Sequence, residues 1–164
     1  MRRPILQVTL LLALLCVLRG NAFGQQASPT AKPTVAAGSI TAEPMMQPEE
    51  LEQILSASGG DKPLIFMVGP HSFYAEAHVP GSEYIGPGKE DSGLEALRDR
   101  VQSLPNDQFI VLYCGCCPWN MCPNVRPAYQ QLVSLGFKRV KMLYIAKNFG
   151  ADWVKKGYPV EKGR

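Results

Sequence analysis

Apolar and polar positions alternate along residues 46–164 in two kinds of pattern. Short continuous apolar runs bounded by turn residues predict buried strands at 63–68, 109–113 and 140–145. Helical spacing of apolar residues predicts four helices. The first begins within 46–51 and ends at Gly59-Gly60, and the others span 93–103, 127–135 and 149–156. Apolar strands that alternate with helices are typical of a mostly parallel sheet flanked by helices on both faces. We therefore predict an α/β fold.

The first 24 residues carry a different apolar pattern. Arg2 and Arg3 precede an apolar run at 5–18, and a stretch rich in small residues follows at 19–24. This order is typical of a secretory signal peptide, and the run is shorter than the about 20 residues that a membrane-spanning helix needs. We expect cleavage after Ala22 or Gly24 and an exported protein, periplasmic or secreted. The alternative is an uncleaved anchor, and only in that form would the chain contact a membrane.

Residues 25–45 are rich in Ala, Pro, Ser and Thr and contain few large apolar side chains. Such a segment buries too little surface to offset the entropy of ordering, so we expect a flexible linker. Residues 46–164 then have the length of one ordinary domain.

Loss of the predicted signal peptide changes the charge of the chain. The full sequence has 17 basic and 14 acidic residues, a formal net charge of +3. Residues 1–24 hold three arginines and no acidic residue, which leaves 17 − 3 = 14 basic against 14 acidic residues and a net charge of zero. Proteins that bind nucleic acid usually show a basic face, so the neutral composition argues against a nucleic-acid partner.

Four of the five cysteines lie within the thirteen residues CGCCPWNMCPNVR, at 114–126. This segment follows the predicted strand 109–113, which places Cys114 at the carboxyl end of a strand, where ligands bind in parallel α/β sheets. Backbone N–H groups at such a turn can form a nest for anions and lower the pKa of a thiol. We therefore expect the sulfur of Cys114 to be ionised, accessible and nucleophilic.

The neighbouring cysteines leave three interpretations open. A disulfide from Cys122 to Cys116 or Cys117 would staple the loop of a non-catalytic domain, because exported thiols tend to be oxidised. The four loop cysteines, Cys114 included, could instead bind copper or zinc as thiolates, although their spacing lacks the usual two Cys-x-x-Cys pairs. In the interpretation that we favour, Cys114 attacks and another loop cysteine resolves the product into a disulfide, without a cofactor.

Five segments in order resemble the rhodanese-like family. The sequence EELEQIL at 49–55 resembles the opening helix of the family, HVPGSEYI at 78–85 its His-[Ile/Val]-Pro-Gly-Ala motif, and IVLYC at 110–114 the strand that ends in its catalytic cysteine. The sequence LVSLGFKRVKML at 132–143 resembles the helix, glycine turn and strand that follow the active loop. The closing pattern, with its Trp-containing helix and Gly-x-Pro-Val, is similar to FGADWVKKGYPVEKG at 149–163.

The resemblance implies a rhodanese-like fold and a sulfurtransferase. In this family a thiolate takes sulfane sulfur from a small donor, becomes a persulfide and passes the sulfur to a thiol acceptor. By position Cys114 would carry that role, and a redox partner protein would re-reduce the loop. The expected substrate loop comprises Gly115, Cys116, Cys117, Trp119, Cys122 and Arg126. Arg126 could donate a charge-assisted hydrogen bond to an anionic donor such as thiosulfate.

The chain departs from the family pattern around this loop. About four residues usually separate the cysteine from an arginine, whereas eleven separate Cys114 from Arg126 here. The usual arginine position falls near Asn124, and the Asp and Arg that commonly follow the first strand appear as Met67 and Gly69. The sequence therefore does not predict a standard substrate pocket.

Three ring-bearing residues outside the loop have simpler expected roles. His78 leads the turn VPGS, and we expect it to support that turn by a local hydrogen bond. Phe149 and Trp153 lie on the closing helix and are expected in the core.

Overall fold

The computed structural model describes residues 44–163 of the chain. The predicted signal peptide, 1–24, and the predicted linker up to residue 43 lie outside the described residues. Across residues 44–163, no helix has both the length and the apolar character needed to span a membrane.

The centre of the domain is a sheet of five parallel strands in the order β1-β5-β4-β2-β3. Their bounds are β1 Met45–Met46, β2 Leu64–Met67, β3 Glu83–Tyr84, β4 Phe109–Tyr113 and β5 Arg139–Leu143. β4 is the middle strand, with Met67 of β2 opposite Tyr113 and Met142 of β5 opposite Leu112. The predicted α/β fold with a parallel sheet is confirmed.

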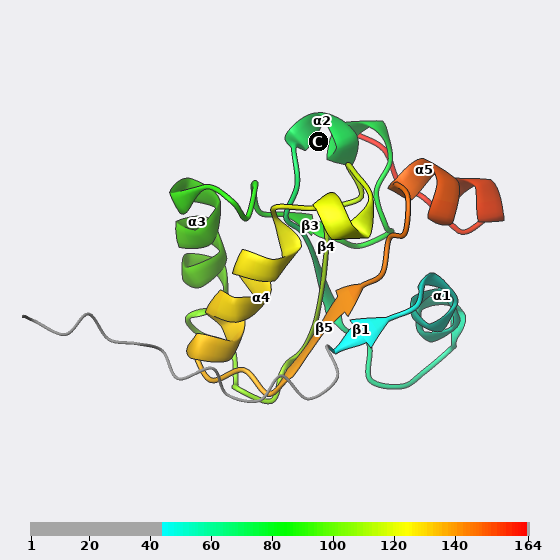
Figure 1. Cartoon of the computed structure of the whole chain (residues 1–164). Helices are drawn as coiled ribbons and strands as arrows, with labels where there is room; N and C mark the ends of the chain where they lie inside the picture. The colour runs from blue at the N-terminus through cyan, green and yellow to red at the C-terminus, as the bar shows by residue number, and fades with distance from the viewer. Residues whose placement is uncertain (1–43, 164) are drawn as a thin grey trace, which may run out of the picture. The chain divides into compact units, whose positions relative to one another are not determined.

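Helices cover both faces of this sheet. They are α1 Pro48–Ser56, α2 His71–Glu76, α3 Asp91–Val101, α4 Val125–Ser134 and α5 Phe149–Asp152, with the short 3-10 turns η1 Trp119–Met121 and η2 Val154–Lys156. In Figure 1, α3 and α4 lie on one side of the sheet, and α1 and α5 on the other. The sheet is therefore shielded from water on both faces.

Successive residues of β4 point into two separate cores. Leu112 packs with Leu97 of α3 and Leu132 of α4, whereas Tyr113 packs with Phe149 and Trp153 on the opposite face. Side chains along a strand alternate between faces, so a strand buried on both faces must be apolar throughout. This explains the uninterrupted apolar runs in the sequence. The expected core positions of Phe149 and Trp153 are confirmed, because both are buried.

The strand predicted at 109–113 coincides with β4, and the other predicted elements are found within a few residues. α4 begins at Val125, two residues before the predicted start. Pro127 is then the third helical residue, where the N–H that proline lacks would have had no intrahelical partner. Two of the unpredicted elements, β1 and β3, are two residues long each, too short for a periodic signal. Met45, the last residue of the predicted linker, lies in β1.

The turn after α2 is fastened to the last described residues. His78 and Glu161 exchange backbone hydrogen bonds of 2.9 and 3.0 Å, and Nδ1 of His78 lies 2.8 Å from the carbonyl oxygen of Tyr74. The ring of His78 stacks on that of Tyr74 with 3.8 Å between centroids. The expected local hydrogen bond of His78 is therefore confirmed.

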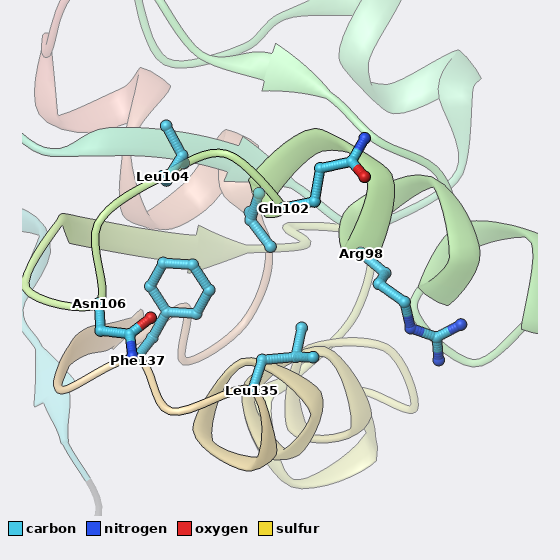
Figure 2. Close-up of a pocket in the computed structure, with 7 residues that line it drawn as sticks. Arg98, Gln102, Leu104, Asn106, Leu135 and Phe137 are labelled. Carbon is cyan, nitrogen blue, oxygen red and sulfur yellow. The ribbon is translucent and has the colours of Figure 1, made fainter.

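A cavity of about 250 Å³ lies at the amino ends of β4 and β5 (Figure 2). Arg98 and Gln102 line it from α3 and the residue that follows, and Leu135 and Phe137 line it from the turn after α4. None of its lining residues is a cysteine, and the cysteine loop begins at the opposite, carboxyl end of β4. The cysteine loop and this cavity therefore lie at opposite ends of the sheet.

The hydroxyl of Tyr113 gives the first testable prediction. It accepts a hydrogen bond of 3.1 Å from the N–H of Val79 and shares a second hydrogen bond, also of 3.1 Å, with Oγ of Ser82. The substitution Tyr113→Phe leaves the buried N–H of Val79 without this partner, so we expect the free energy of unfolding to fall by about 1–3 kcal/mol. Urea unfolding measures this change. The control Tyr129→Phe, on a half-buried tyrosine of α4, should change stability by less than about 0.5 kcal/mol. Equal stabilities of the two variants would contradict the assigned role.

Candidate active site at the carboxyl end of the central strand

Gly115 turns the chain out of β4 into the cysteine loop. Its φ is +77°, a left-handed conformation that glycine adopts without strain. A Cβ at this position would lie 2.8 Å from Cβ of Phe149, and the carbonyl oxygen of Gly115 accepts a hydrogen bond of 2.9 Å from the N–H of Phe149. The close approach of α5 therefore fixes the direction in which the loop leaves the strand.

The outer part of the loop is held by Trp119. Its backbone N–H donates a hydrogen bond of 3.4 Å to the carbonyl oxygen of Ala146, and its ring meets that of Tyr144 edge-on with 5.6 Å between centroids. Cζ of Arg126 lies 5.5 Å from the centroid of the same ring, which is a cation–π distance. The structure thus brings together Trp119 and Arg126, two of the residues predicted for the substrate loop.

The four loop cysteines form one cluster of free thiols. Sγ of Cys116 lies 3.1 Å from Sγ of Cys114 and 3.1 Å from Sγ of Cys117. Cys122 packs against the core cluster that contains Cys114, and the thiols of Cys114 and Cys122 shift each other's pKa. The residues that the sequence singled out for thiol chemistry are therefore within reach of one another.

The position of Cys114 differs from the expectation. Only 2% of this residue is exposed, and it packs in the core beneath α3 and α4 with Val125 as a neighbour. A Cβ on Gly69 would come within 2.6 Å of its sulfur, so the backbone after β2 covers the thiol closely. The expectation of an accessible sulfur is wrong, because the backbone at Gly69 and the core residues at the start of α4 cover it.

Asn124 is a site residue whose role the sequence did not reveal. It is 2% exposed, and its Nδ2 donates a hydrogen bond of 3.3 Å to Sγ of Cys114. Its Oδ1 accepts a hydrogen bond of 3.2 Å from the N–H of Lys89, which orients the amide. The available signal was that the usual family arginine falls near this position. Here a neutral amide faces the sulfur from that position.

The negative charge of the cluster resides on Cys122 rather than on Cys114. The hydrogen bond to Cys122, together with burial, raises the pKa of Cys114 far above its ordinary value. The same hydrogen bond, aided by the backbone N–H groups of Asn124 and Val125, lowers the pKa of Cys122 to about 6. Two interacting thiols share one proton, and the sulfur with more N–H donors keeps the charge. Burial raises the pKa of Cys117 to about 12.

A cavity of about 360 Å³ opens beside the inner part of the loop. Cys114, Gly115 and Cys116 line it, whereas Cys117 and Cys122 do not. Its other walls come from α2, α5, η2 and the last described residues; the side chains include Phe73, Glu76, Phe149, Val154 and Lys162. These residues are far apart in sequence, so no local sequence pattern predicts the cavity.

Two sulfur–sulfur distances in the cluster are shorter than those around a tetrahedral zinc ion. Four thiolates around tetrahedral zinc, with bonds of about 2.3 Å, lie about 3.8 Å apart. The Cys114–Cys116 and Cys116–Cys117 sulfur distances are both 3.1 Å. Within the described part of the chain, no group of three or more His, Cys, Asp or Glu side chains is arranged to hold a metal.

Comparison with known families and structures relates this geometry to other proteins. The model of the rhodanese-like domain family matches residues 47–144. The solution structure of the rhodanese-like domain of the Alr3790 protein from Anabaena sp. is 26% identical, with a TM-score of 0.54, and the match covers 73% of this chain and 80% of that domain. No curated protein sequence matches the chain.

Two further solved structures are similar in fold alone. The BH2092 protein from Bacillus halodurans is 24% identical over 72% of this chain and 76% of its own, with a TM-score of 0.55. The RPA3614 protein from Rhodopseudomonas palustris, described as a protein of unknown function and possible tyrosine phosphatase, is 16% identical with a TM-score of 0.52, over 73% of this chain and 85% of its own.

The charge on Cys122 gives the second prediction. In the reduced protein, we expect the rate of Cys122 alkylation by iodoacetamide to rise with a midpoint near pH 6, because its pKa is lowered to about 6. Cys117 is the internal control, and its rate should keep rising above pH 9 because its pKa is raised to about 12. Quenched samples mapped by tandem mass spectrometry give both profiles. A midpoint of about 8.5 at Cys122, as for an ordinary thiol, would contradict the assigned charge.

Proposed function

The chain belongs to the rhodanese-like domain family, and from this membership we propose that it is an exported sulfurtransferase that carries sulfane sulfur as a persulfide on Cys114. Family membership supports a sulfurtransferase-like or related role. The observation that supports this particular proposal is the cluster of four free thiols at the carboxyl end of β4. A persulfide carrier needs a nucleophilic thiol, and an adjacent thiol allows the product to be resolved.

The surroundings of Cys114 suit a stored persulfide. Nδ2 of Asn124 donates to its sulfur at 3.3 Å, and the backbone N–H of Cys116 is a second donor that favours negative charge there. A persulfide is an anion near neutral pH and gains from both donors. Burial to 2% exposure keeps water and oxidants away from the stored sulfur.

The cavity beside Cys114 is the proposed binding site of a small thiol acceptor. Its volume of about 360 Å³ lies in the range of small-molecule sites. Phe73 and Val154, which line it, are large apolar side chains with about 40% exposure and would be covered by a bound acceptor. The acceptor thiolate attacks the outer sulfur of the persulfide and leaves Cys114 as a thiol.

The proposed reaction uses thiols alone. The small sulfur donor and the thiol acceptor are its substrates, and no metal, nucleic acid or other cofactor takes part. If a loop cysteine attacks the inner sulfur instead, an internal disulfide forms and sulfide leaves. A redox partner protein outside the cytoplasm would then re-reduce the loop.

The third prediction tests sulfur transfer. The reduced full-length protein, treated with thiosulfate, should gain about 32 Da, the mass of one sulfur, with the persulfide mapped at equilibrium to Cys114. Transfer of this sulfur to cyanide should fall on the order of 100-fold or more in Cys114→Ser, which lacks the proposed carrier. The control Ser134→Ala, on an exposed residue at the other end of α4, should retain the transfer.

Two results would contradict this proposal. Transfer by Cys114→Ser at the wild-type rate would remove Cys114 as the carrier. Failure of the wild type to take up sulfur from thiosulfate, and also from an organic persulfide, would remove the sulfurtransferase activity itself. Copper and zinc determination on protein purified without chelator separates both results from metal binding by the four cysteines.

A further inference from the structure

We propose that Cys122 makes the first attack on the sulfur donor and then passes the sulfane sulfur to Cys114. This inference rests on the proposed sulfurtransferase function and assigns that reaction a second catalytic residue. Four observations support it: exposure, the proximity of the two sulfurs, the N–H donors at each sulfur, and the different faces that the sulfurs occupy.

Exposure separates the two cysteines. Cys114 is 2% exposed and closely covered by the backbone of Gly69. Cys122 is half-buried and follows Met121, which is 71% exposed at the outer side of the loop. A donor in solution therefore reaches the sulfur of Cys122 more readily than that of Cys114.

At the start of the reaction, the surroundings of the two sulfurs favour a thiolate at Cys122 and a protonated thiol at Cys114. Cys122 lies beside the N–H groups of Asn124 and Val125 and is ionised near neutral pH, whereas the thiol of Cys114 holds the shared proton. The thiolate is the nucleophile in sulfur chemistry. The sulfur that can attack is thus also the sulfur that a donor can reach.

Proximity of the two sulfurs allows direct transfer. Cys122 packs against the core cluster that contains Cys114, and the two thiols shift each other's pKa. Reacting groups held close together in this way need no diffusional encounter.

The chemistry balances in two steps, written with thiosulfate as donor. The Cys122 thiolate attacks the outer sulfur of thiosulfate; a Cys122–sulfur bond forms, the sulfur–sulfur bond of thiosulfate breaks, and sulfite leaves with the electron pair. Sγ of Cys114 then attacks that same outer sulfur. The Cys114 persulfide anion forms, the bond to Cys122 breaks, and the proton of Cys114 ends on the sulfur of Cys122. No external oxidant or reductant is consumed.

The two sulfurs occupy different faces of the site. The cavity of about 360 Å³ is lined by Cys114 and Cys116 but not by Cys122. Sulfur would thus be collected at the outer face of the loop and given to an acceptor in the cavity.

A rapid-quench time course tests this order of events. The reduced full-length protein is mixed at pH 7 with thiosulfate that carries a heavy isotope in its outer sulfur, then alkylated, and the label is located by tandem mass spectrometry. We expect the label on Cys122 first and on Cys114 later. In Cys122→Ser the rate of uptake should fall at least tenfold. In Cys114→Ser, Cys122 should still take up label, but the label should stay there.

Each other result has a defined meaning. Label that appears first on Cys114, together with uptake at the wild-type rate in Cys122→Ser, overturns the transfer from Cys122 but leaves the proposed function standing. Label on no cysteine of the wild type overturns the proposed function. The control Ser134→Ala, on an exposed residue at the other end of α4, should keep wild-type order and rate. Because the wild-type time course needs no substitution, it decides the question even if a variant fails to fold.

Discussion

The site depends on the burial of β4 on both faces. As the middle strand of the sheet, β4 is paired with β2 and β5, and its residues from Ile110 to Tyr113 are buried. A strand held in this way cannot shift its register without moving apolar side chains to the wrong core. The position of Cys114 at the end of the strand is therefore fixed. The remaining loop residues therefore pack around a sulfur whose position is set by the strand.

A fixed and covered sulfur explains why the pKa values of Cys114 and Cys122 are shifted in opposite directions. Burial disfavours the charged form of Cys114, and the thiol can then donate its hydrogen bond to Cys122. That donation, added to the N–H groups at the start of α4, stabilises the thiolate of Cys122. The pKa of each thiol therefore depends on the other thiol as well as on its own surroundings. One proton is shared, and once sulfur sits on Cys122, the donors around Cys114 favour a negative charge there.

The sequence predicted the sheet well because buried strands leave a direct signal. The apolar run at 109–113 and the turn at Gly115 place Cys114 without any knowledge of its neighbours. The exposure and charge of its sulfur depend on Gly69 and Asn124, which lie in other segments and approach only in the folded chain. Both residues stand at positions where the chain departs from the family pattern. Their shared role at one sulfur is a property of the tertiary structure.

These departures have one physical explanation. With a side chain at position 69, a Cβ would be 2.6 Å from the sulfur of Cys114, so glycine makes room for the buried thiol. An amide at position 124 can hydrogen-bond that thiol without adding a charge to the core. The eleven residues between Cys114 and Arg126 give the chain enough length to return a second sulfur to the first. A loop of about four residues would reach α4 without a residue at the position of Cys122, so the longer loop is what the proposed transfer between two sulfurs requires.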